Sequence, residues 1–430
     1  MVIITGHVLY FVADPFNGTP QDAAKIIQDG AVYVHEGKIH DFGPRADIIQ
    51  RFPTAPVQDY RDHLIMAGFV DAHVHYPQTA MIASWGKRLI DWLNTYTFPE
   101  ESKFIDAAYA DTIANRYLDL ALAHGTTTVA SFCTIHPESV DAIFTAASAR
   151  NMCVVAGKTC MDRNAPDTLR DTAQAAYDQS KALLEKWHGQ GRNRYAITPR
   201  FSPTSTPEQL RALGALWAEH PDVLMQTHLS EQVDEIEWVK GLFPQARDYL
   251  DTYEAFGLLG ANGLYGHAIH LEPREIDRLR DVDAAVVHCP TSNTFIGSGL
   301  FDARGVIRHG IRTGLATDTG GGSSFSMLHT MAAAYEIGQL RGTALHAAEL
   351  LWMGTCGSAK ALRLDGEIGN IAKGHIADLV AINLASTPAI SQRHTKAFDI
   401  WDAVFATIMM GDDRAIAQVW VAGDPYKDAI

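Results

Sequence analysis

The feature that most constrains this fold is an eightfold alternation of short β-type segments with longer helical segments between about residues 67 and 374. Each β-type segment is rich in Val, Ile and Thr and ends in polar residues, which is typical of a strand followed by a loop. The eight segments are residues 70–75, 126–132, 152–160, 195–201, 224–230, 263–270, 284–291 and 312–319. Between them lie helical patterns such as residues 106–124 and 207–220. This alternation predicts an α/β fold, a (β/α)₈ barrel of the TIM type.

The two ends of the chain have a different pattern. Residues 2–13, 31–35 and 38–42 are typical of short strands, with turns expected at Asp29-Gly30 and Glu36-Gly37. Residues 377–382 and 417–422 have a similar pattern. Because these strands bracket the barrel in sequence, we expect them to pair in one small β-domain beside it. The expected domains are residues 1–66 together with 375–430, and a catalytic barrel of residues 67–374.

Composition favours a small-molecule substrate. The formal net charge of −15, with no long basic run, argues against a surface for nucleic acid or anionic lipid. The first residues lack the pattern of a secretory signal, and no apolar run reaches membrane-spanning length. The five cysteines form no CxxC pair, which indicates reduced thiols. We therefore expect a cytoplasmic protein.

The ends of the predicted strands carry a consistent set of metal-type ligands. His73 and His75 end the first strand, and residues two apart on a strand point to the same side. His228 ends the fifth strand, His267 the sixth and Asp318 the eighth. Since catalytic groups of such barrels lie at the C-terminal ends of strands, these side chains are expected to meet. His73, His75, His228 and Asp318 would form the first shell of a metal ion.

Imidazoles with one carboxylate suit Zn²⁺, and an open position would make the site catalytic. Glu231, three residues past His228, could take a proton from a zinc-activated water and deliver it to a ring nitrogen. Asp318 could receive a second proton and pass it to a departing amine. An isolated HxH pair is more often coincidental than metal-binding, so the prediction depends on the agreement of four strand ends.

Several motifs resemble those of the amidohydrolase superfamily. Residues 68–75, Gly-Phe-Val-Asp-Ala-His-Val-His, resemble its first-strand signature, and residues 374–380 resemble its return into a terminal β-sandwich. Four stretches resemble its guanine deaminase branch: residues 75–78, 162–166, 197–201 and 288–293. The resemblance covers the whole chain and implies the hydrolysis of guanine to xanthine and ammonia. It also implies a barrel with a small β-sandwich and a homodimer.

The resemblance also implies roles for individual residues. His73, His75, His228 and Asp318 would bind zinc, Glu231 and Asp318 would move protons, and His267 would lie beside the water or the substrate. Gln78, Arg200 and Phe201 would frame the purine, with Gln78 and Arg200 as donors towards its oxygen-bearing edge. Superfamily members with two metals usually place a lysine at the end of the fourth strand, where this chain has Pro199-Arg200-Phe201. One zinc per subunit is therefore expected, and Lys158 is interpreted as structural or solvated.

Other functions remain open at this point. An aminohydrolase of the same fold acting on a triazine, a pterin or an adenosine-type substrate would share the ligands, although Gln78 and Arg200 favour guanine. A non-catalytic scaffold would be expected to lack a ligand or the acid, and none is missing here. His136-Pro137-Glu138 matches half of the cytidine-deaminase signature, but no PCxxC follows it.

Overall fold

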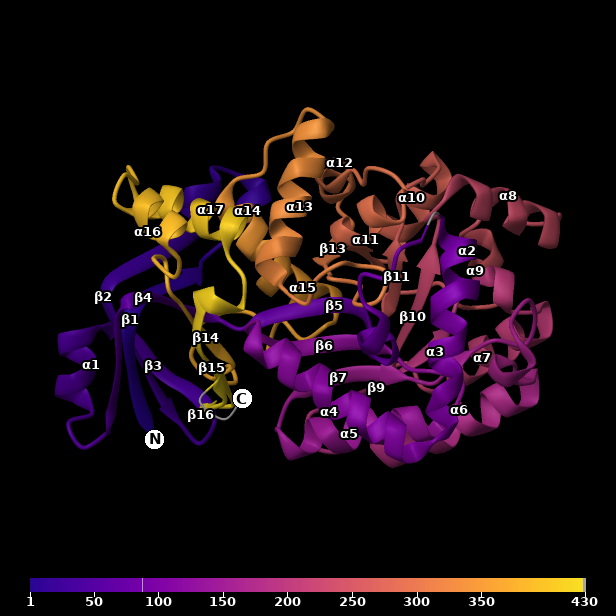
Figure 1. The fold of residues 1–430 in the computed structure, drawn as a ribbon, viewed down its shortest axis with the longest axis horizontal. Helices are drawn as coiled ribbons and strands as arrows, with labels where there is room; N and C mark the ends of the chain where they lie inside the picture. The colour runs from indigo at the N-terminus through magenta and orange to yellow at the C-terminus, as the bar shows by residue number, and fades with distance from the viewer. Residues whose placement is uncertain (87, 428–430) are drawn as a thin grey trace. The chain divides into compact units, whose positions relative to one another are not determined.

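The computed structural model describes residues 1–86 and 88–427 and contains the predicted parallel barrel (Figure 1). The hydrogen-bonded order of its strands is β13-β12-β11-β10-β9-β7-β6-β5, and the short β8 pairs with β9. The edge strands also approach each other, because Asp318 N–H donates to the His73 carbonyl (3.0 Å) and His75 N–H donates to the Thr319 carbonyl (3.1 Å). The strands are β5 Phe69–His75, β6 Thr126–Phe132, β7 Cys153–Gly157, β8 Thr159–Cys160, β9 Asn193–Pro199, β10 Leu224–Leu229, β11 Gly263–His267, β12 Ala285–His288 and β13 Arg312–Leu315.

Burial explains why the sequence forms parallel strands here. Every residue of β5, β6 and β10 is buried, as expected when a parallel sheet is covered on both faces. Helices α5, α6 and α7 contact strands β7 and β9 on their outer side (Figure 1). The helices of the barrel region are α4 Ala107–Ala123, α5 Pro137–Ala149, α6 Ala173–Trp187, α7 Pro207–Glu219, α8 Val233–Leu242, α9 Asp251–Glu254, α10 Pro273–Asp281, α11 Pro290–Phe295 and α12 Ala303–Arg308.

Three barrel strands are shorter than the sequence predicts. Strands β11, β12 and β13 end at His267, His288 and Leu315, three or four residues earlier than expected. His267, the last residue of β11, has a φ angle of 66°, and Asp318, three residues past β13, has a φ angle of 49°; both angles turn the chain away from the extended conformation of a strand. After β12 the chain instead enters α11 at Pro290. The polar ends of the predicted strands are thus loops that leave the sheet.

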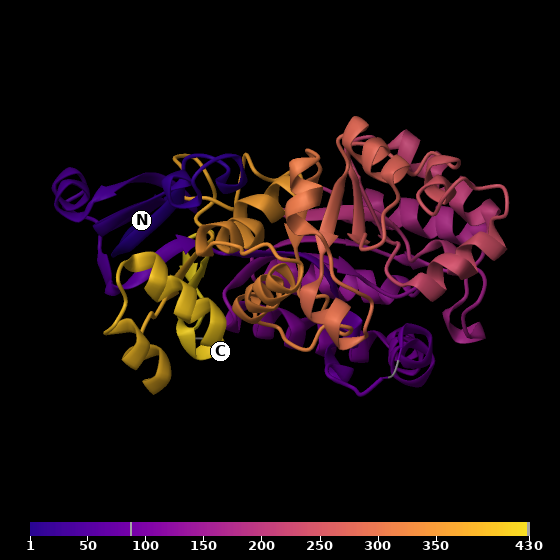
Figure 2. The same ribbon diagram turned by 90° about the horizontal axis from the view of Figure 1, so that it is seen from above.

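The terminal strands form a single seven-stranded mixed sheet of order β16-β15-β14-β4-β1-β2-β3. The N-terminal strands in indigo and the C-terminal strands in yellow lie side by side in both views (Figures 1 and 2). Its strands are β1 Val2–Phe11, β2 Ala24–His35, β3 Lys38–Pro44, β4 Val57–Ala67, β14 Leu379–Ile382, β15 Ile416–Val421 and β16 Asp424–Pro425. The short helices α2 Leu89–Trp92 and α3 Phe98–Glu101 precede α4. The remaining helices are α1 Arg45–Arg51, α13 Met327–Leu340, α14 Ala347–Trp352, α15 Ser358–Ala361, α16 Pro388–His394 and α17 Ile400–Met410.

One predicted turn is present and the other is wrong. Glu36 and Gly37 have φ angles of 50° and 75° and form the turn between β2 and β3. Asp29 and Gly30 instead lie inside β2, where Gly30 pairs with Gly6 beside an irregularity in the ladder. A Cβ atom on Gly30 would lie 2.8 Å from a Val8 methyl, so glycine serves here for a close approach of strands.

Contacts within the chain define two units. One comprises residues 1–71, 119–128 and 325–430, and the other comprises residues 72–118 and 129–324. The sequence-based division at residues 66/67 and 374/375 therefore remains a proposal. Among the residues described, no helix combines the length and apolar character that crossing a membrane would require.

Candidate metal centre and substrate pocket

Four side chains at the C-terminal ends of barrel strands lie together, as the sequence predicts. The Nε2 atoms of His75 and His228 are 3.1 Å apart. Asp318 Oδ1 lies 3.6 Å from His73 Nε2 and 3.7 Å from His75 Nε2. All four side chains are buried. These four side chains thus come from β5, from the end of β10 and from the loop beyond β13.

The protonation of the histidines suits a cation. Burial, together with the positive charges of neighbouring groups, lowers the pKa of His73, His75 and His228 well below the ordinary value. Neutral imidazole is the form that binds metals. His228 Nδ1–H donates to the Arg200 carbonyl at 2.7 Å, which leaves the lone pair of Nε2 directed at the cluster.

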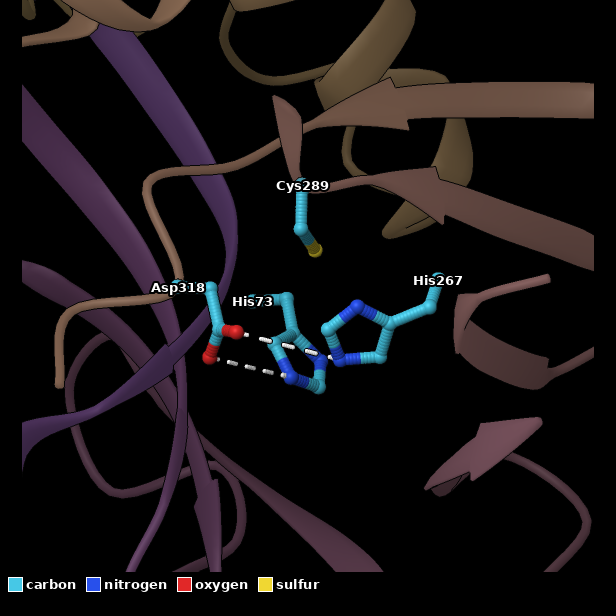
Figure 3. Close-up of side chains that lie close together, drawn as sticks. All are labelled: His73, His267, Cys289 and Asp318. Atoms are coloured by element: carbon cyan, nitrogen blue, oxygen red, sulfur yellow. Dashed lines mark ion pairs between the residues drawn. The ribbon is translucent and has the colours of Figure 1, made fainter. Parts of the chain in front are cut away.

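The donor set fits a bound metal. His73 Nε2 is buried and has no hydrogen-bond partner, although an unpaired buried polar atom is costly. The ligand atoms of His73, His75 and His228 all lie within 4.8 Å of one another. A second group within the same limit contains His73, His267, Cys289 and Asp318 (Figure 3). Imidazole and carboxylate are the side chains that bind zinc in catalytic sites, and the unpartnered Nε2 of His73 fits a metal ligand.

The backbone is strained where the site residues leave the barrel. Ser230, His267 and Asp318 all have positive φ angles, of 48°, 66° and 49°. Non-glycine residues in this region cost about 1–2 kcal/mol each, and such residues cluster at active sites. The two hydrogen bonds between the C-terminal end of β5 and residues 318–319 help to hold Asp318 in this conformation.

His267 lies between two carboxylates, those of Glu231 and Asp318. His267 Nε2 is 3.6 Å from Glu231 Oε2 and 3.8 Å from Asp318 Oδ2 (Figure 3 shows the latter pair). Although burial opposes it, these two carboxylates raise the pKa of His267. Burial raises the pKa of Glu231, and Asp318 adds to this effect. Raised pKa values of acidic groups are typical of side chains that accept and donate protons in active sites.

A pocket opens beside the cluster and contains the residues predicted to frame a purine. Gln78, which follows β5 in the 3₁₀ turn Tyr76–Met81, lines it together with Arg200 and Phe201. The apolar side chains of Leu89 and Trp92 line it as well. His75, His228, Glu231, His267 and Asp318 also line this pocket. The ligand cluster and the substrate-framing residues therefore face one cavity.

Several residues of the site were missed by the sequence analysis. Ser298 Oγ–H donates to Glu231 Oε1 at 2.9 Å, and Glu235 Oε2 accepts from the Glu231 backbone N–H at 2.9 Å. Asn293 Oδ1 accepts from His267 Nδ1–H at 2.9 Å. Asn293 belongs to the His-Cys-Pro-Thr-Ser-Asn motif, which gave a signal, but no local pattern marks Ser298. Glu101, the fourth such residue, is described below.

Lys158 is buried and is not solvated, which decides between the two interpretations offered for it. Its side chain has an exposure of 0%, and its ammonium group pairs with Asp171, whose other oxygen accepts from Gln209 Nε2–H at 2.7 Å. Lys158 is therefore engaged in a buried ion pair.

Comparisons with known proteins agree with this geometry. The Amidohydrolase family profile matches residues 64–425. A guanine deaminase of Escherichia coli is 44% identical over 402 residues, which cover 93% of this chain and 92% of that protein. The structure of E. coli guanine deaminase has a TM-score of 0.96 at 42% identity, with 99% of both chains covered. A guanine deaminase from C. acetobutylicum, solved with guanine in its active site, has a TM-score of 0.89 at 29% identity and covers 99% of both chains. The chain therefore belongs to the amidohydrolase family.

Proposed function

We propose that this protein catalyses the hydrolytic deamination of guanine to xanthine and ammonia. The observation that carries the proposal is one cavity in which Glu231 and a His/Asp cluster face the Arg200 guanidinium and the Gln78 amide. Relatives named guanine deaminase, matched over nearly the whole chain, support the same substrate.

The cofactor of the proposed reaction is one zinc ion per chain, held by His73, His75, His228 and Asp318. Zinc supplies Lewis-acid activation of water, so that a nucleophile is available near neutral pH. The lysine that would accompany a second metal is absent from the end of β9, where Arg200 follows Pro199.

Glu231 is the proposed proton carrier. Its Oε2 accepts a proton from the attacking water and delivers it to a ring nitrogen of guanine. The burial that raises its pKa makes the protonated form accessible during turnover. Ser298, bonded to Oε1, leaves Oε2 as the oxygen nearer to His267.

Asp318 has two oxygens in different surroundings. Oδ1 faces His73 and His75, whereas Oδ2 faces His267. Oδ1 would hold the cation while Oδ2 takes the second proton of the water and passes it to the departing amine. His267 Nε2, placed between Asp318 and Glu231, would orient the water or the substrate.

Arg200 and Gln78 would select the substrate. A planar guanidinium can donate to the carbonyl oxygen of guanine, and Phe201 gives the purine an apolar neighbour. Adenine carries an amino group in place of that carbonyl, so it would leave a buried donor unpaired. A site built on such hydrogen bonds rejects a mismatched analogue by about 10⁴-fold.

The test is a panel of guanine, adenine, cytosine and a triazine, assayed by ammonia release. Guanine should be the preferred substrate by a wide margin, and Arg200→Ala should lower its kcat/KM strongly without changing the zinc content. The proposal fails if another ring is the better substrate or if Arg200→Ala leaves guanine kinetics unchanged.

We also propose that the protein is a cytoplasmic homodimer. The five cysteines are buried and form no disulfide bond, which fits a reducing compartment. Sedimentation of the purified protein tests the dimer, and fractionation of its native cells tests the location.

A further inference from the structure

Glu101 is a buried carboxylate that the reaction described above does not use. It ends helix α3, Phe98–Glu101, and its exposure is 0%. No sequence motif singles it out. An ionised side chain is rarely buried so completely unless it is paired.

Each oxygen of Glu101 accepts a hydrogen bond from a side chain that frames the purine. Arg200 Nη1–H donates to Oε2 at 2.7 Å, and Gln78 Nε2–H donates to Oε1 at 2.8 Å. The Arg200 and Gln78 side chains are themselves buried, with exposures of 3% and 1%. Because a carboxylate only accepts, the contact also sets which end of the Gln78 amide faces it. Glu101 therefore joins the two polar groups that would recognise the substrate.

The local backbone explains how Glu101 reaches this position. Helix α2, Leu89–Trp92, and α3 are joined by a π-helical turn, Leu93–Thr97, in which Phe98 N–H donates to the Leu93 carbonyl. Pro99 cannot donate to the carbonyl four residues earlier, and its ring crowds that carbonyl, which favours the wider turn. The first part of this helical segment lines the pocket, and its last part carries Glu101.

The charge of Glu101 matters as much as its geometry. The Arg200 guanidinium is close enough to the ligand cluster to lower the pKa values of His73, His75 and His228, although burial is the larger cause. Glu101 supplies a negative charge 2.7 Å from that guanidinium. Arg200 can then donate hydrogen bonds without presenting an unbalanced positive charge to the pocket.

This balance bears on product release. Xanthine has two ring carbonyls and loses a ring proton more readily than guanine, because the resulting anion is delocalised over both. Without the Glu101 carboxylate, the Arg200 guanidinium in a low-dielectric pocket would hold such an anion strongly. With the carboxylate beside it, the pocket would favour a neutral oxopurine.

We propose that Glu101 is a positioning and specificity-determining residue: it holds Arg200 and Gln78 for the substrate and cancels the charge that would otherwise retain the anionic product. This inference rests on the proposed function, because it assumes guanine as substrate and xanthine as product.

The experiment compares Glu101→Gln with Glu100→Gln at pH 8. Glu100 is the preceding residue of the same helix and is also buried, but it bonds Lys103 Nζ (2.5 Å) and the Tyr109 hydroxyl. Guanine kinetics, inhibition by xanthine and by the less acidic hypoxanthine, thermal unfolding and zinc content are measured for each variant.

Glu101→Gln removes the charge and can accept from only one of the two donors in the same way. We expect the KM for guanine to rise about tenfold or more, with a smaller change in kcat, because a charged hydrogen bond to a binding residue is lost. The inhibition constant of xanthine, divided by that of hypoxanthine, should fall about tenfold, because the unbalanced guanidinium binds the xanthine anion more tightly. Glu100→Gln should change neither quantity by more than about twofold.

A third variant separates the effect of the Glu101 charge from that of the side-chain length, and it tests the proposal if Glu101→Gln does not fold. Glu101→Asp keeps the charge on a shorter side chain, so it should raise the KM while leaving the inhibitor ratio near that of the unmodified protein. Glu101 has no such role if a folded Glu101→Gln behaves like Glu100→Gln, or if Glu101→Asp leaves the KM unchanged. Failure of the unmodified protein to release ammonia from guanine would instead refute the proposed function.

Discussion

Replacing Glu231 with Gln tests proton transfer with little change in shape. Glu231 is 3% exposed, accepts from Ser298 Oγ at 2.9 Å, and is held through its backbone N–H by Glu235. A glutamine can keep the Ser298 contact and fill the same volume. What it loses is the ability to carry a proton beside His267 Nε2, 3.6 Å away.

General acid–base groups contribute about 10²–10⁴-fold, which corresponds to about 3–5.5 kcal/mol of activation free energy. Glu231 would act both on the water and on the ring nitrogen, so we expect a loss in kcat at the upper end of this range. Zinc binding should persist, because Glu231 is not among the proposed ligands. Ammonia release and elemental analysis of the same sample measure the two quantities.

Ser298→Ala is the matched control. It removes one hydrogen bond to Glu231 and leaves the carboxyl group, and a net hydrogen bond is worth about 0.5–1.5 kcal/mol, or roughly 2–12-fold in rate. The proposed role of Glu231 would be refuted by a Glu231→Gln variant that stays within about tenfold of the unmodified enzyme or that loses no more activity than Ser298→Ala.

Three further predictions concern the metal, the core and the effect of acid. His73→Ala combined with His75→Ala should abolish a zinc content of about one per chain, and elemental analysis showing full retention, or two metals in the unmodified protein, would contradict the ligand assignment. Asp171→Asn leaves the buried Lys158 ammonium unpaired and should lower the free energy of unfolding by about 3–5 kcal/mol, measured in denaturant; a change under about 1 kcal/mol would contradict it. Burial lowers the pKa of His288 from 6.5 to about 3, so the unfolded chain binds a proton there below pH 6.5 that the folded chain does not. The free energy of unfolding therefore falls with pH, and His288 accounts for about 2 kcal/mol of the decrease at pH 5. His288→Leu should lose about 2 kcal/mol less than the unmodified protein between pH 7.5 and pH 5. Equal losses in the two proteins would show that His288 does not contribute.

The sequence predicts the barrel and the cluster well because both follow from short-range patterns. The strands are buried runs of apolar residues, and the ligands lie within a few residues of strand ends, where the barrel brings them together. The proximity of His73, His75, His228 and Asp318 could be predicted on this basis. Strand β4 was missed because residues 57–63 are all partly or fully exposed and charged side chains interrupt the apolar run.

The residues that support the site depend on tertiary proximity, which local patterns do not report. Glu101 is 99 residues from Arg200 and Ser298 is 67 residues from Glu231, yet each pair is hydrogen-bonded. Nothing in the neighbourhood of either residue distinguishes it from an ordinary helix or loop residue. The pairing of Lys158 was also undecided, since burial of an ammonium group depends on Asp171 being placed beside it.

The helical segment from Leu89 to Glu101 separates substrate recognition from the residues proposed to carry out the hydrolysis. The proposed metal ligands are carried by the barrel strands and the loops that follow them, whereas part of the pocket wall and the anchor for Arg200 and Gln78 come from this one helical segment. Natural selection can therefore vary the length or the residues of that segment and obtain a new ring preference while the hydrolytic apparatus is inherited intact. Relatives that act on more acidic rings are expected to have a different residue at the position of Glu101.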